Sequence, residues 1–134
     1  GTKAGVEFFH GYTYSAHPLA VAAGLAAQEI YKEEGIYDKV TSNAKYFEDG
    51  IHSLKGSPHI TDIRNIGLAG GLTIAQRDGV VGARAYDFFL KAYEHGVALR
   101  PNGDTIAIAP ILTSEPKNLD PIFDALQKAA NEIN

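Results

Sequence analysis

The amino-acid sequence predicts an α+β fold in which helices pack on a small, mostly antiparallel sheet of three or four strands. Three observations predict this fold class. The chain has 134 residues, of which 45% are hydrophobic, which is enough to form the core of one domain. Apolar residues recur at helical spacing in several separate segments. Short β-branched segments lie between them, and Asn102-Gly103 is a typical hairpin turn.

The start of the chain predicts an arm followed by a buried helix. Residues 1–17 are rich in Gly, aromatic and hydroxyl residues and show no period, so we expect an extended arm. Pro18 suits the first turn of a helix, and Ser15 or His17 is placed to cap it. Small apolar residues occur on almost every side of residues 19–31, which is typical of a buried helix.

The next segments predict an amphipathic helix and two strands. In residues 36–54 apolar side chains recur at steps of three and four with charged residues between them, which predicts a surface helix. Gly56 and Pro58 end this pattern. Residues 60–66 mix β-branched and polar side chains as a half-buried strand does, and residues 72–75 predict a second strand. The glycines between the two predict a tight turn or bulge, so the strands are expected to pair antiparallel.

The rest of the chain predicts a helix, a hairpin and a closing helix. Residues 83–93 carry the apolar side chains of a third helix. The strands of the hairpin are predicted at residues 97–100 and 105–109. One apolar stripe predicts a last helix that begins within residues 114–120. We therefore expect residues 18–134 to form the domain and the preceding residues to form the arm.

Composition excludes several classes of protein. A net charge of −4 with 21% charged residues matches neither a disordered chain nor a basic nucleic-acid-binding protein. No apolar run is long enough to span a membrane, and no signal sequence is present. The absence of Cys excludes disulfides, thiolate zinc sites and a cysteine nucleophile. We expect a cytoplasmic protein without nucleic-acid or membrane partners. Because the chain begins at Gly1 and contains no Met, we expect it to be processed, tagged or cut from a longer chain.

An unusual run of aromatic, hydroxyl and imidazole side chains occupies residues 8–18. Thr13, Ser15 and nearby backbone N–H groups could present hydrogen-bond donors to an anion at a helix N-terminus. The alternative is a capped helix start with aromatic contacts to the core. His10 and His17 have no third ligand at metal-binding spacing, so we expect no metal site.

Two arginines stand out in the predicted sheet. Arg100 ends an apolar strand directly before the hairpin turn, where its guanidinium could hold a carboxylate through two hydrogen bonds. The alternative is an ordinary salt bridge, for instance with Asp104. Arg64 is similar, with a pair to Asp62 or a structural role as its alternative. The glycines at residues 67–71 fail the dinucleotide-loop pattern because no helix follows them. No serine triad, nucleophile elbow or phosphate-binding loop is present, so the chain by itself offers no catalytic machinery.

Three motifs resemble those of the class III aminotransferases, enzymes of pyridoxal phosphate (PLP) fold type I. Residues 10–18 resemble the family's His-Gly-x-Thr-Tyr-Ser-x-His-Pro motif. Residues 62–68 resemble its Val-Arg-x-x-Gly-Leu strand, and residues 100–110 resemble its Arg-x-x-Gly-Asp-x-Ile stretch. The motifs occur in the family's order and span essentially the whole chain. The ω-amino acid (β-alanine):pyruvate transaminases are the subgroup that the chain resembles most.

The resemblance implies a fold, a reaction and several site residues. The chain resembles the C-terminal part of the small domain of such an enzyme. Thr13, with Tyr14 and Ser15, would contact the phosphate of PLP bound to the neighbouring subunit, which implies a homodimer or homotetramer. Arg100 would bind the carboxylate of the substrate and swing aside for an amine without one. The implied reaction transfers an amino group from an ω-amino acid or amine, such as β-alanine, to pyruvate.

One departure from the family concerns catalysis. The family forms a Schiff base through a lysine well upstream of its first motif, and only Lys3, which matches nothing in the lysine motif, precedes that motif here. We therefore expect no catalytic residue in this chain and no activity of the chain alone. A non-catalytic α+β binding or dimerisation module remains an alternative. Other enzymes of the same fold type, an aminomutase or a decarboxylase, are further alternatives.

Overall fold

The computed structural model describes residues 12–134. The chain divides into two compact units, Gly1–Glu34 and Gly35–Asn134. The boundary after residue 17 that the sequence predicts between arm and domain stays a prediction. The helix α1 (Pro18–Glu33) belongs to the first of these units. No helix among the described residues is long and apolar enough to cross a membrane.

Residues 12–17 of the predicted arm form turns. The amide of Ser15 donates to the carbonyl of Tyr12 at 3.0 Å, and the amide of His17 donates to the carbonyl of Tyr14 at 3.3 Å. Pro18 begins α1 as expected, but its N-cap residue, His17, makes no side-chain capping bond, so the predicted side-chain cap is wrong. Residues 1–11 of the arm lie outside the described residues.

The prediction that α1 is a buried helix is wrong for this chain. None of its residues is buried, and Leu19 and Leu25 are 77% and 63% exposed. Small apolar side chains on every side suit burial only where other elements cover the helix. Residues 12–34 contain no second helix or strand that could do so.

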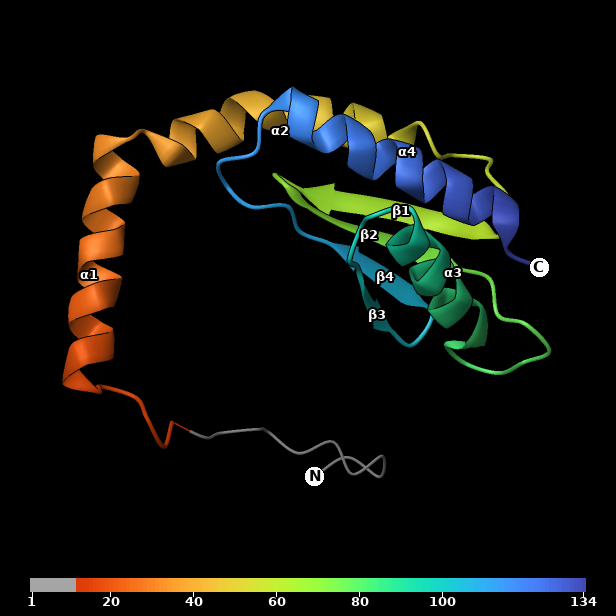
Figure 1. The fold of residues 1–134 in the computed structure, drawn as a ribbon, viewed down its shortest axis with the longest axis horizontal. Helices are drawn as coiled ribbons and strands as arrows, with labels where there is room; N and C mark the ends of the chain where they lie inside the picture. Colours follow the sequence, from red (N-terminus) through yellow and green to blue (C-terminus); the bar gives the residue numbers. More distant parts are fainter. Residues whose placement is uncertain (1–11) are drawn as a thin grey trace. The chain divides into compact units, whose positions relative to one another are not determined.

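The second unit has the predicted α+β architecture, with three helices packed on one face of a four-stranded antiparallel sheet (Figure 1). The strand order is β1-β2-β4-β3. In chain order the elements are α2 (Ile36–His52), β1 (Ile60–Ile66), β2 (Ala69–Ile74), α3 (Ala83–Glu94), β3 (Arg100–Asn102), β4 (Thr105–Ile108) and α4 (Pro116–Glu132). The predicted antiparallel pairing of the first two strands and the predicted hairpin are both confirmed.

The hydrophobic core lies between the sheet and the helices. Phe47 of α2, Phe88 of α3 and Leu126 of α4 are fully buried against Leu72 and Ile106 of the sheet. Burying one such side chain stabilises the fold by about 1.5–3 kcal/mol. Because side chains of all three helices share this one core with the sheet, the helices cover the same face of the sheet.

The strand β2 begins three residues earlier than the sequence predicted. It includes Gly70 and Gly71, which the sequence analysis assigned to a turn. A Cβ on Gly70 would lie 3.1 Å from side-chain atoms of Phe47 and Ile51, so the bare backbone lets α2 pack closely. Gly70 is therefore a strand residue because of its packing against α2.

The strand β3 is shorter than predicted and shifted toward the turn. It contains Pro101, which is tolerated because β3 is an edge strand. Asn102 pairs with Thr105, so the hairpin loop consists of Gly103 and Asp104. The positive φ of 56° at Gly103 fits this tight connection.

Candidate functional site

One face of the sheet carries polar and small side chains and is not covered by the helices of the second unit. In β4, Ile106 and Ile108 are buried in the core, so Thr105 and Ala107 point to the opposite face. We call this opposite side the outer face, and its central residues are Asp62, Arg64, Gly71, Thr73, Arg100, Thr105 and Ala107. Both arginines that the sequence singled out therefore lie on one surface.

The register of the sheet places the two arginines in one row. Arg64 of β1 pairs with Gly71 of β2, Gly71 pairs with Ala107 of β4, and Ala107 pairs with Arg100 of β3. Directly paired residues of antiparallel strands point to the same face. The row therefore has a guanidinium-bearing residue at each edge and only small residues between them.

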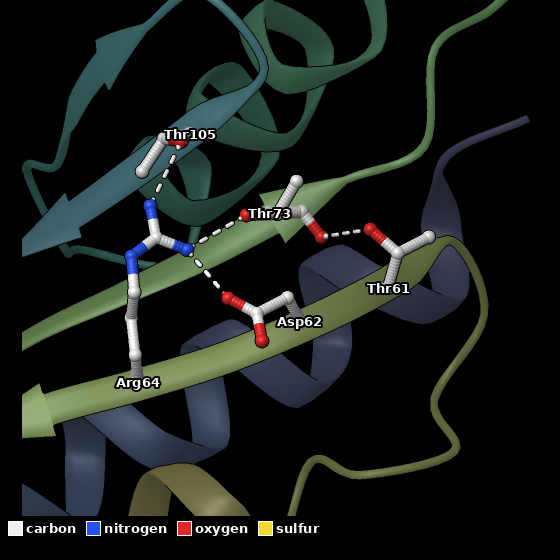
Figure 2. Close-up of polar contacts among 5 residues, drawn as sticks. All are labelled: Thr61, Asp62, Arg64, Thr73 and Thr105. Carbon is white, nitrogen blue, oxygen red and sulfur yellow. Dashed lines mark hydrogen bonds and ion pairs between the residues drawn. The ribbon is translucent and has the colours of Figure 1, made fainter.

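Arg64 is held by three side chains from three strands (Figure 2). Its Nη1 atom donates to Oδ2 of Asp62 at 2.7 Å and to Oγ1 of Thr73 at 2.8 Å. Its Nη2 atom donates to Oγ1 of Thr105 at 3.2 Å. A Cβ on Gly71 would lie 3.5 Å from the Cζ atom of Arg64, so the guanidinium crosses β2 over this glycine. The pair with Asp62 that the sequence left as an alternative is present.

Arg100 is exposed and has no such anchors. No hydrogen bond or ion pair joins its side chain to another residue within 12–134, so the alternative of a salt bridge to Asp104 is wrong. The carboxylate of Asp104 instead accepts from the amide of Gly82 at 2.7 Å and from Nε2 of Gln76 at 2.6 Å. The Gly82 amide, with a smaller effect of Gln76, lowers the pKa of Asp104 below its ordinary value. The guanidinium of Arg100 is therefore available to a ligand.

A shallow hollow of about 360 Å³ lies on the outer face. Its polar lining residues are Arg64, Asn65 and Thr105, and Ile66, Ala69 and Ala107 are among its apolar lining residues. Such a surface combines hydrogen-bond donors with an apolar floor, which suits a small organic anion.

Thr13, Tyr14 and Ser15 lie together in the turns that precede α1. All three are exposed, and their hydroxyl groups form no hydrogen bond with other described residues. The first backbone N–H groups of a helix lack partners within the helix, so this end can bind an anion. Free hydroxyls beside it are a donor set that fits a phosphate group. Arg100 belongs to the other compact unit.

The histidines do not form a metal centre within the described part of the chain. No group of three His, Cys, Asp or Glu side chains there could hold a metal ion. His95 lies at the C-cap of α3, where its Nε2 atom is 2.9 Å from a carboxylate oxygen of Glu132. His10 lies outside the described residues.

The sequence analysis missed the threonines that hold Arg64. That Thr73 and Thr105 lie beside Arg64 follows from the register of the sheet, which the sequence alone does not give. The alternation of Ile106 and Ile108 was a usable signal for Thr105, because it places this residue on the face away from the core. No comparable signal identifies the partners of Asp104.

Comparisons with known proteins agree with this architecture. The sequence model described as aminotransferase class-III matches residues 2–130. The beta-alanine–pyruvate aminotransferase of Pseudomonas aeruginosa is 44% identical over 128 residues, which are 96% of this chain and 29% of that protein. The omega-aminotransferase of Caulobacter vibrioides is 38% identical over 134 residues, 100% of this chain and 30% of that protein.

Solved structures show the same fold. A thermostable omega transaminase six-fold mutant from Pseudomonas jessenii has a TM-score of 0.82 at 25% identity, covering 92% of this chain and 29% of that one. An adenosylmethionine-8-amino-7-oxononanoate aminotransferase from Methanocaldococcus jannaschii has a TM-score of 0.81 at 27% identity, and the match covers 96% of this chain and 31% of that one. The chain thus spans about 30% of the length of the curated relatives that it matches. Because the family match extends over nearly all of the sequence, the chain belongs to the class III aminotransferases.

Proposed function

We propose that this chain is the C-terminal part of a PLP-dependent aminotransferase that transfers an amino group from an ω-amino acid or amine, such as β-alanine, to pyruvate. One observation carries this proposal: the side chain of Arg100 is exposed and forms no hydrogen bond or ion pair within the described residues, at the position where the family motif has its carboxylate-binding arginine. The names of the relatives from Pseudomonas aeruginosa and Caulobacter vibrioides support the same class of reaction.

Arg100 binds the substrate carboxylate in this proposal. A guanidinium matches a carboxylate with two parallel hydrogen bonds, which fix both the position and the orientation of the substrate. Arg100 is the first residue of the edge strand β3, and the short Gly103-Asp104 loop follows that strand. Since no carboxylate of residues 12–134 forms an ion pair with it, the side chain is free to bind an acid or to turn away from a donor without a carboxylate.

Thr13, Tyr14 and Ser15 hold the cofactor phosphate in this proposal. Their hydroxyls and the N-terminus of α1 supply donors and a partial positive charge, as a phosphate requires. Bound PLP supplies the electron sink that amino-group transfer needs. In the family motif these residues serve the site of the neighbouring subunit, so the enzyme is proposed to be a homodimer or homotetramer.

The experiment compares the full-length enzyme with the 134-residue chain. We expect the full-length protein to form alanine from pyruvate with β-alanine as donor, and the chain alone with added PLP to form none. Alanine formation by the chain alone would show that it contains its own reactive amine. Release of CO₂ or an isomerised amino acid from the full-length protein, without alanine, would replace the proposed reaction by a decarboxylase or an aminomutase.

A further inference from the structure

We propose that Arg64 is a second carboxylate-binding residue on the outer face and that it acts beside Arg100. This inference rests on the proposed function, because it assigns Arg64 to the same substrate. Its ligand class is a small carboxylate, such as an amino acid or a keto acid. The sequence leaves a carboxylate-binding role of Arg64 open beside a pair to Asp62 or a structural role, and the geometry shows that the pair to Asp62 leaves part of the guanidinium free to bind.

The position of the Arg64 guanidinium is the first reason. Arg64 begins on β1, two strands away from β4, yet its Nη2 atom reaches Thr105 of β4. The strand β3, which carries Arg100, is the next neighbour of β4. Adjacent strands are about 4.8 Å apart. The guanidinium of Arg64 lies over Gly71 of β2, so it is one strand spacing nearer to β3 than the backbone of Arg64 is.

The unused donors of Arg64 are the second reason. A guanidinium has five N–H donors, and the contacts to Asp62, Thr73 and Thr105 use three of them. Nε and one N–H of Nη2 have no partner among the described residues. Figure 2 shows Nε on the side of the guanidinium that is turned away from Asp62. This free edge can bind a carboxylate through two hydrogen bonds.

The rigidity of the side chain is the third reason. Hydrogen bonds to side chains of three strands fix the guanidinium before any ligand arrives, and the missing side chain of Gly71 leaves room for it over β2. A preorganised donor loses little conformational entropy on binding. The neighbouring hollow, with Ala69 and Ala107 in its lining, provides apolar surface for the carbon atoms of the ligand.

The kinetic test uses the full-length enzyme with Arg64→Met and, as matched control, Arg77→Met. Arg77 is also an arginine in an ion pair, 2.6 Å from Asp87, but it is not an outer-face residue. We expect Arg64→Met to raise KM for β-alanine and pyruvate roughly tenfold while KM for 1-phenylethylamine, which has no carboxylate, stays within about twofold. Arg64→Lys keeps the positive charge but cannot donate two parallel hydrogen bonds, so an intermediate KM for β-alanine and pyruvate is expected. Equal increases for all substrates would show a merely structural role and overturn the proposal.

A binding test uses the 134-residue chain and propionate as probe. We expect propionate to shift the NMR signal of Nε of Arg64 more than that of Arg77. Unchanged Arg64 signals at saturating propionate, with Arg100 signals shifted, would overturn the role of Arg64 and leave the proposed function standing. If the full-length enzyme transfers no amino group but propionate still shifts both outer-face arginines, the proposed function fails while the carboxylate site stands.

Discussion

Arg64 and Arg100 lie at opposite edges of the sheet in a single row of paired residues, with only Gly71 and Ala107 between them. Their surroundings differ. The guanidinium of Arg64 is held by an aspartate and two threonines, whereas the guanidinium of Arg100 has no hydrogen-bond or ion-pair partner among the described residues. The second unit thus presents one fixed and one free guanidinium on the face of the sheet that its own three helices do not cover.

The contact between Arg64 and Thr105 predicts a measurable coupling. Removing it with Thr105→Val should destabilise the fold only slightly, because Arg64 is half exposed. In a double-mutant cycle with Arg64→Met, the coupling free energy should be about 0.5–1 kcal/mol. Urea denaturation of the four variants measures it. The same cycle with Thr41→Val, whose hydroxyl bonds to a helix carbonyl in α2, should give no coupling. An equal coupling for Thr41 would mean that the effect is not a local contact.

Two helical glycines should respond in opposite ways to alanine. A Cβ on Gly50 of α2 would lie 2.2 Å from ring atoms of Phe123 in α4, whereas a Cβ on Gly24 of α1 would meet nothing within 4 Å. Overpacking costs about 1–3 kcal/mol, so Gly50→Ala should lower the free energy of unfolding. Gly24→Ala should increase helix content, because alanine is favoured over glycine in a helix by roughly 0.5–1 kcal/mol. Denaturation and circular dichroism measure both changes, and a stabilised Gly50→Ala variant would contradict this packing of α2 on α4.

The carboxylate of Asp104 should make stability depend on pH. Its hydrogen bonds, chiefly from the amide of Gly82, lower its pKa in the folded state. The ionised group therefore stabilises the fold at pH values above the ordinary pKa of aspartate, and this contribution is lost as the pH falls through the lowered pKa. Asp104→Asn should reduce the urea midpoint at neutral pH and flatten its decrease toward acid. Asp124→Asn, at an exposed position on α4 without a hydrogen bond to described residues, is the control. Identical acid profiles for wild type and Asp104→Asn would refute the assignment.

The helices and strands were predictable from the sequence where the spacing of apolar residues or a turn motif determines them. The apolar spacing of α2 and α4 located both helices, and the Asn102-Gly103 turn located the hairpin. The start of β2 was not predictable, because Gly70 is a strand residue only when Phe47 and Ile51 pack against it. The exposure of α1 was not predictable either, since its composition is that of a covered helix.

The sequence singled out the two arginines of the outer face but neither the threonines that hold Arg64 nor the geometry of the row. Motif and chemistry together singled out Arg100 and Arg64. Whether Arg100 is paired depended on Asp104, whose carboxylate is taken by Gly82 and Gln76 from outside the hairpin. Such partners come from the tertiary fold, and no spacing within the hairpin indicates them.

The most direct test of the proposed function is the substrate dependence of Arg100→Met in the full-length enzyme. Losing a bidentate, charge-assisted contact worth about 1.5–3 kcal/mol should raise KM for β-alanine and for pyruvate at least tenfold. KM for 1-phenylethylamine should stay within about twofold, because this donor has no carboxylate for Arg100 to bind. Unchanged KM values for β-alanine and pyruvate would contradict the assignment of Arg100 as the carboxylate-binding residue, and with it the proposed role of the outer face.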